Sequence, residues 1–280
     1  MRTHILARFI GRQEEINKLL AIAQKQSASF VVVRGRRRIG KSRLIEEFSQ
    51  YFNKFYRIVT VLATGSKERN EICEILKIGP GGRISEYLSE LELAGFITRD
   101  YTWNIRSGAD SKLSKYRLSD NYLRFYLKYI DKNLSKINRD SFQFKSLTSL
   151  SEWNTIMGLQ FKNLVLNNRA LIRQALKISP EAIISENPFY QNKTDRYPGC
   201  QIDYMIQTKF NTLYVCEIKF LKDTVGSSVI DEVQKKIDAL KHPKGYSCRP
   251  VLIHVNGVTQ DVIDSDYFVS IIDFSRHLED

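Results

Sequence analysis

The chain has 280 residues, of which 42% are hydrophobic and 26% are charged. These values are ordinary for a globular protein and exclude a disordered, collagen-like or low-complexity chain, and the length predicts two domains or three small ones. The formal net charge is +12, and it is uneven: residues 1–55 hold 12 Lys and Arg against 4 Asp and Glu, whereas residues 151–280 hold 15 against 16. This asymmetry favours a polyanionic partner for the first half, with a merely solubilising basic surface as the alternative.

The chain carries no signal for a membrane or for secretion. No apolar run approaches the length that crosses a bilayer, and residues 1–10 lack the apolar segment of a secretion signal. Four widely spaced cysteines without a C-x-x-C pair predict reduced thiols and a cytoplasmic location, and four dispersed histidines make a zinc site unexpected.

The first predicted elements surround a phosphate-binding motif. Helical spacing of apolar residues predicts a helix over 14–23, a β-branched run predicts a strand over 30–33, and a second helix is expected from Lys41. Between the strand and the second helix, residues 35–42 read G-R-R-R-I-G-K-S and match G-x-x-x-x-G-K-[ST] in full. In such a loop backbone N–H groups surround phosphate oxygens, the lysine reaches the β- and γ-phosphates, and the serine hydroxyl binds Mg²⁺. The predicted ligands are therefore ATP and Mg²⁺, with a chance basic loop as the alternative. The nucleotide-binding residues are Gly35, Arg38, Gly40, Lys41 and Ser42.

ATP hydrolysis needs more than this loop. An acidic residue at the end of a second strand must help to hold Mg²⁺. The apolar run nearby, 58–63, is followed by Thr64-Gly65-Ser66 and has no acid at its end. Too few residues remain for the strand–helix units, of about 30 residues each, that a parallel P-loop sheet requires. We therefore expect little or no ATP hydrolysis.

The next segment has the element order of a winged helix-turn-helix. Helices are predicted over 68–76 and 83–93, and strands over 96–104 and 115–118 form a hairpin around a polar loop. Arg83 on the second helix is a candidate for DNA contact. Because it is the one basic residue at the non-core positions of that helix, a winged helix used for protein packing is equally open. On the wing, the candidates for phosphate contact are Arg106, Lys112 and Lys115.

The remaining chain predicts an aromatic helix after Ser119-Asp120, a polar linker at 131–150 and then an α/β unit. Helices are expected over 156–176 and 228–240. Strands are expected over 202–206, 213–220, 250–255 and 268–272.

An acid pair lies on two of these strands. If they pair about a turn near Phe210, Asp203 lies opposite Glu217, and Lys219 projects to the same side as Glu217. Opposed like charges destabilise a sheet, and a divalent cation between the two carboxylates would remove that penalty. Lys219 would then position a water or stabilise the transition state. This predicts Asp203 and Glu217 as Mg²⁺ ligands and all three residues as catalytic in phosphodiester cleavage. The alternative is a solvated hairpin face on which Lys219 neutralises the two acids.

Together, these segments resemble the archaeal-type P-loop ATPases, a branch of the AAA-like NTPases. In that family a winged helix and a domain similar to the PD-(D/E)XK nucleases follow the ATPase core. Residues 9–15 look like its F-x-G-R-x-x-E, residues 116–126 like its Y-R-[IL]-x-D-x-[YF]-L-R-F stretch, and residues 158–164 stand where it carries G-x-x-F-E-x-L. Asp203 and Glu217-x-Lys219 fall on the nuclease-like motif.

The chain departs from that family twice. The Walker B strand, sensor and lid regions are missing, and the helix Glu that would assist metal binding is Lys162 here. An ammonium group near the cation opposes metal binding unless it points away.

The resemblance implies a multidomain α/β architecture. Its parts are a P-loop ATPase fragment at 1–55, a winged helix-turn-helix with the following helix at 56–130, a linker at 131–150 and a nuclease-like domain at 151–280. The implied function is an ATP-binding, DNA-associated protein with little or no ATP hydrolysis. The alternatives are a Mg²⁺-dependent DNA nuclease independent of ATP, a non-enzymatic DNA-binding protein, and an inactive remnant.

Overall fold

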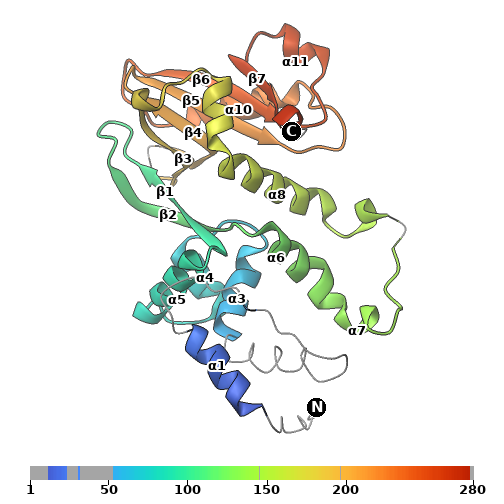
Figure 1. Ribbon diagram of the computed structural model, residues 1–280. Helices are drawn as coiled ribbons and strands as arrows, with labels where there is room; N and C mark the ends of the chain where they lie inside the picture. Colours follow the sequence, from blue (N-terminus) through green and yellow to red (C-terminus); the bar gives the residue numbers. More distant parts are fainter. Residues whose placement is uncertain (1–11, 24–30, 32–52, 145, 196, 278–280) are drawn as a thin grey trace.

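The structure is a computed structural model that describes residues 12–23, 31, 53–144, 146–195 and 197–277 (Figure 1). It has a mixed α/β fold, as predicted. In the N-terminal segment it describes helix α1, Gln13–Ala23. The phosphate-binding motif at 35–42, with Gly35, Arg38, Gly40, Lys41 and Ser42, lies outside the described residues.

Three helices and a hairpin form the first unit. They are α3 (Asn53–Leu62), α4 (Arg69–Leu76), α5 (Gly82–Leu93), β1 (Ile97–Trp103) and β2 (Asp110–Leu118). Helices α4 and α5 and both strands follow the predicted order. The apolar run at 58–63 is helical, because Ile58, Val59 and Leu62 lie on one face of α3 and are buried against the other helices. A single backbone bridge between Lys67 and Tyr116 adds a third extended segment beside the hairpin.

A series of short helices connects the two units. Helix α6 (Asn121–Phe125) begins where the Asp120 carboxylate accepts a hydrogen bond from the backbone N–H of Leu123. It continues into turns at η1 (Tyr126–Ile130) and η2 (Asp131–Asn133), and then into α7 (Leu134–Ile137) and η3 (Leu147–Ser149). The predicted linker at 131–150 thus consists of short helical turns and irregular backbone.

The second unit is a five-stranded sheet with helices on both faces. The strand order is β3-β4-β5-β6-β7; β3, β4 and β5 are antiparallel, and β6 and β7 continue from β5 in parallel. The strands are β3 (Ile183–Gln191), β4 (Cys200–Thr208), β5 (Thr212–Lys219), β6 (Ser247–His254) and β7 (Ser270–Asp273). The helices are α8 (Trp153–Asn167), α9 (Arg169–Ala175), η4 (Pro180–Ala182), α10 (Ser228–Ala239), α11 (Gln260–Asp264) and η5 (Phe274–His277).

Two hydrophobic cores hold the helices to this sheet. On one face Phe161 and Val165 of α8 pack with Ile206 of β4. On the other face Val233 of α10 packs with Val215 of β5. Because side chains alternate along a strand, neighbouring residues of β4 and β5 supply both cores.

The hairpin of the first unit also belongs to the second. Trp103 and Ile105 are buried in the core beneath α10, and β1 lies beside β3 (Figure 1). The two units therefore share packing through the β1–β2 hairpin (residues 97–118), which is called the wing below. No helix in the described part of the chain has the length and apolar character that a membrane span requires.

Candidate functional site

The structure brings the predicted acid pair together. Strands β4 and β5 pair with Tyr204 opposite Cys216, which is the register expected for a turn centred near Phe210. The same register brings Asp203 to the position opposite Glu217. The backbone N–H of Ile218 donates a hydrogen bond of 3.1 Å to Oδ2 of Asp203, so this carboxylate is fixed to the neighbouring strand.

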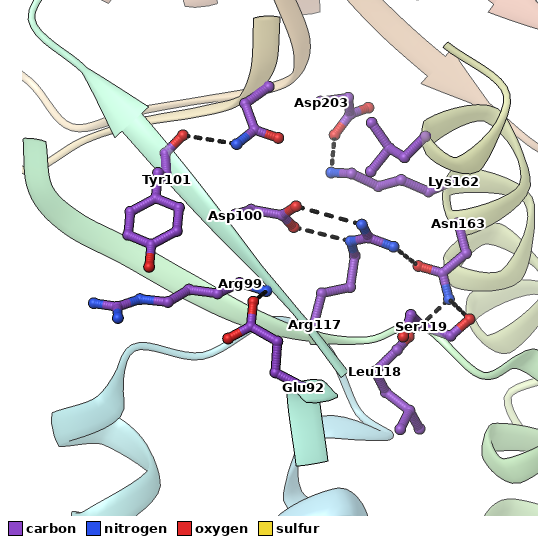
Figure 2. Close-up of polar contacts among 12 residues, drawn as sticks. Glu92, Arg99, Asp100, Tyr101, Arg117, Leu118, Ser119, Lys162, Asn163 and Asp203 are labelled. Carbon is purple, nitrogen blue, oxygen red and sulfur yellow. Dashed lines mark hydrogen bonds and ion pairs between the residues drawn. The ribbon is translucent and has the colours of Figure 1, made fainter. Parts of the chain in front are cut away.

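Three lysines from three elements neutralise the two acids. Lys162 of α8 points toward Asp203, and its Nζ lies 2.6 Å from Oδ1 (Figure 2). Lys236 of α10 forms an ion pair with Oε2 of Glu217. The Nζ of Lys219 lies 3.3 Å from Oε1 of Glu217 and also pairs with Glu232. Both carboxylates of the acid pair are thus bound by ammonium groups of the protein itself.

The electrostatics of the two acids differ. Burial and the neighbouring charge of Asp203 raise the pKa of Glu217, although Lys236 and Lys219 oppose this shift. Burial also opposes ionisation of Asp203, but Lys162, Lys236 and the Ile218 N–H outweigh it and hold its pKa below the usual range. Asp203 is therefore the firmly ionised member of the pair.

This donor set does not fit Mg²⁺ as arranged. Magnesium prefers an octahedral shell of oxygen ligands, commonly one or two carboxylates with water. Both oxygens of Glu217 and one oxygen of Asp203 already face ammonium groups. The described residues contain no group of three or more His, Cys, Asp or Glu side chains arranged to hold a metal ion. A bound cation would have to displace Lys162 and Lys236, which would then remain beside a +2 charge.

Sequence reasoning missed Lys236, although a signal for it exists. The buried residues of α10 are Val229 and Val233, and Leu240 just beyond the helix is also buried. Lys236 is three residues after Val233 and four before Leu240, so it occupies a core-facing position of the helix. A lysine at such a position needs a buried anion, and that anion is Glu217.

A second polar cluster joins the wing to α8 beside this site (Figure 2). Asp100 of β1 is fully buried and accepts two hydrogen bonds from Arg117 of β2, at 2.9 and 3.3 Å. Arg117 also donates to Oδ1 of Asn163 at 2.5 Å, and the amide of Asn163 donates to the backbone oxygen of Leu118 at 2.7 Å. Asn163 follows Lys162 in α8, so one turn of helix serves both clusters.

The predicted DNA-contacting residues do not form one group. Arg83 is exposed on α5, and Arg106 and Lys112 are exposed on the wing. Lys115 instead turns toward the second unit, where its Nζ lies 4.9 Å from the centre of the Tyr190 ring. The wing thus has one exposed basic side and one side committed to the sheet.

Comparison with known proteins assigns no family to the chain. No family model matches the chain, and no curated protein matches it. Among solved structures, a repair endonuclease from Pyrococcus abyssi is similar over 40% of this chain and 43% of its own, with 18% sequence identity and a TM-score of 0.27. The match therefore spans less than half of that endonuclease, and the ATPase resemblance stays a prediction.

Proposed function

We propose that the chain is a DNA-associated protein that binds DNA without cleaving it. In this proposal a winged-helix unit contacts DNA, and a nuclease-like unit carries an acid pair held by lysines. One observation carries the proposal: Asp203 and Glu217, the two residues a catalytic cation would need, are ion-paired with Lys162 and Lys236.

Charge balance explains why the lysines would exclude a cation. The site holds the carboxylates of Asp203, Glu217 and Glu232 and an equal number of ammonium groups, from Lys162, Lys219 and Lys236. The like-charge penalty that would attract a metal is therefore already removed. A metal ion would leave ammonium groups unpaired in a largely buried position, which is costly.

The first unit supports the DNA-binding part. Three helices followed by a hairpin, with an added bridge at Lys67, give the element order of a winged helix. Arg83, Arg106 and Lys112 are exposed on it and available to phosphates. The net charge of +12 adds long-range attraction to a polyanion.

A Mg²⁺-dependent nuclease is the second candidate. It is favoured by the juxtaposition of Asp203, Glu217 and Lys219, which lie together as the D…E-x-K pattern predicted. It requires Lys162 and Lys236 to move away from the acids when substrate binds. Binding of ATP with Mg²⁺ at 35–42 remains a separate prediction from the sequence motif.

The deciding experiment measures binding and cleavage on the same preparation of the full chain. Labelled duplex and single-stranded DNA are titrated in increasing salt, and plasmid and single-stranded DNA are incubated with Mg²⁺, Mn²⁺ or EDTA. We expect salt-dependent binding and no metal-dependent cleavage.

Lys219→Ala is the control for contaminating nuclease. Cleavage that requires metal and disappears in this variant would refute the non-cleaving proposal and establish the nuclease. A folded protein that binds no DNA at any salt concentration would refute the DNA-binding part.

A further inference from the structure

A cleft of about 760 Å³ lies between the wing and the second unit. Its walls are wing residues 102–106, the end of β3 at 189–191 and the segment after α10 at 240–244. The volume is within the range of about 300–1,000 Å³ that ligand sites usually have. Neither the acid pair nor its three lysines line this cleft, so it is a separate site.

The lining of the cleft is positively charged. Sixteen described residues line it, and none of these is Asp or Glu. Arg106 stands on the wing side, and Lys241 and Lys244 stand on the opposite side; all three are exposed. Cations on two walls without an acid between them favour an anionic ligand that spans the cleft.

An exposed aromatic ring lies beside these cations. Tyr197 is 40% exposed, and the Nζ of Lys241 lies 4.7 Å from the centre of its ring. Deeper in the cleft, Trp103 and Phe189 pack edge to face at 5.2 Å. Lys241 lies over the Tyr197 ring, which is otherwise partly exposed. A partly exposed ring next to ammonium groups is an arrangement in which an unpaired base can stack while phosphates contact the cations.

One glutamine holds the far wall in place. The Nε2 of Gln191 donates to the backbone oxygens of Pro198 and Ala239, at 2.7 and 2.9 Å. Its Oε1 accepts a hydrogen bond of 2.8 Å from the backbone N–H of Lys241. Gln191 therefore ties the segment that carries Tyr197 to the segment that carries Lys241.

A second glutamine holds the wing wall. The Nε1 of Trp103 donates to Oε1 of Gln207 at 2.5 Å, and Nε2 of Gln207 donates to the backbone oxygen of Ile105 at 2.7 Å. These buried bonds fix the wing against β4. Because both walls are held before any ligand arrives, binding loses little conformational entropy.

We propose that this cleft binds single-stranded nucleic acid. One unpaired base stacks on Tyr197, and consecutive phosphates contact Arg106, Lys241 and Lys244. A duplex keeps its base faces covered by neighbouring pairs, whereas a single strand can offer one to the ring. This inference rests on the proposed function. It adds that the cleft between the two units prefers single-stranded to duplex nucleic acid.

The test measures the affinity of the full chain for a labelled oligo-dT and for a labelled hairpin duplex, by fluorescence anisotropy at several salt concentrations. The cleft variant is R106A/K241A/K244A. The matched control is K209A/K222A/K235A, which removes the same charge from exposed lysines of the second unit outside the cleft. We expect the cleft variant to bind oligo-dT about tenfold more weakly with a smaller salt dependence, and the control to change affinity by less than about threefold.

The ring is tested separately from the charges. Tyr197→Ala should weaken oligo-dT binding about tenfold, whereas Tyr197→Phe, which keeps a stacking face, should bind nearly as the wild type does. Circular dichroism and thermal unfolding verify that each variant is folded.

The outcomes separate this inference from the proposed function. Duplex binding together with unchanged oligo-dT affinity in both cleft variants would overturn the cleft and leave the proposed function standing. No binding to either nucleic acid would overturn both. Displacement of oligo-dT by AMP at equal concentration would show that the cleft binds a mononucleotide, and would overturn the single-strand proposal.

Discussion

Two ionic clusters lie next to each other on α8, and they are built in opposite ways. Asn163 belongs to the cluster of Asp100 and Arg117, which is sealed from solvent and held by a bidentate pair. The preceding residue, Lys162, belongs to the acid pair, where its side chain is 15% exposed and that of Asp203 is 16% exposed. The first cluster uses a rigid guanidinium, and the second uses three flexible ammonium groups.

This difference distinguishes an ionic contact that only joins two elements from one that can exchange its partners. Arginine presents a planar fork that suits a fixed pair, whereas lysine is a compact charge on a flexible chain and can exchange partners. The sealed cluster joins the wing to α8 through three buried side chains, those of Asp100, Arg117 and Asn163. The lysine cluster borders solvent, because the side chains of Lys162, Lys219 and Lys236 are 15%, 22% and 27% exposed. Substitutions at five residues test this contrast.

The largest effect is expected for Asp100→Ala. It leaves the Arg117 guanidinium buried without its anion, which should lower the free energy of unfolding by about 3–5 kcal/mol. Urea unfolding followed by circular dichroism measures this loss. Asp100→Asn, which keeps one acceptor, should lose less. A loss below about 1 kcal/mol for Asp100→Ala would show that the joint is not structural.

The next effect is expected for Asn163→Ala. It removes the acceptor of Arg117 and a donor to the Leu118 oxygen, both buried, at a cost of about 2 kcal/mol. The same unfolding assay applies. Because Asn163 and Asp100 share Arg117, the double variant should lose less than the two single losses added together. Strict additivity would contradict a connected network.

At the lysine cluster, Lys162→Glu should give the protein a stabilising response to metal that the wild type lacks. Without metal, the unpaired Asp203 and the added carboxylate should lower the free energy of unfolding by about 2 kcal/mol. Mn²⁺ at ten times its dissociation constant should then restore about 1.4 kcal/mol. Thermal unfolding with Mn²⁺ or EDTA measures both steps. Lys162→Met is the control: it should lose stability without responding to Mn²⁺, and a wild type stabilised equally by Mn²⁺ would contradict the lysine-held site.

The smallest effect concerns pH. The pKa of Asp203 is lowered in the folded chain, so its ionised form stabilises the fold above its unfolded pKa, about 3.9. That contribution is lost as the pH falls through the lower folded value. The stability difference between wild type and Asp203→Asn, of about 1 kcal/mol, should therefore shrink below about pH 4.

Glu217 provides the opposite sign within the same cluster. Its pKa is raised, so ionisation of this carboxyl group is less favourable in the folded chain than in the unfolded chain. The free energy of unfolding therefore decreases as the pH rises through that raised value. Relative to Glu217→Gln, the wild type should become more stable as the pH falls. Urea unfolding between pH 3 and pH 7 measures both differences, and equal signs for the two acids would contradict the asymmetry.

Local patterns were sufficient to predict much of the second unit. The β4–β5 register followed from a polar turn between two apolar runs, and α10 followed from its helical spacing. Strand β3 was not predicted, because Glu186, Asn187 and Pro188 interrupt its apolar pattern. Proline is tolerated there because β3 is an edge strand, and its register shifts between Asn187 and Phe189.

The complete site could not be predicted from local patterns, because it is assembled from elements that meet only in the folded chain. Asp203, Glu217 and Lys219 could be grouped from strand geometry alone, but their partners Lys162 and Lys236 come from helices on opposite faces of the sheet. Asp100 and Arg117 read as ordinary polar residues of an exposed hairpin. They are buried because the second unit covers the wing, which no periodicity within the hairpin can indicate.

The contact between β1 and β3 also limits how the chain can be divided. Thr102 of β1 accepts a hydrogen bond from the backbone N–H of Tyr190, and Asn187 donates to the backbone oxygen of Tyr101 at 3.0 Å. These bonds cover the outer edge of β3. A fragment beginning near residue 150 would expose this edge to other copies of itself, and exposed strand edges promote aggregation. Recombination that exchanged the first unit for another would meet the same barrier, so the two units are expected to be inherited as a pair.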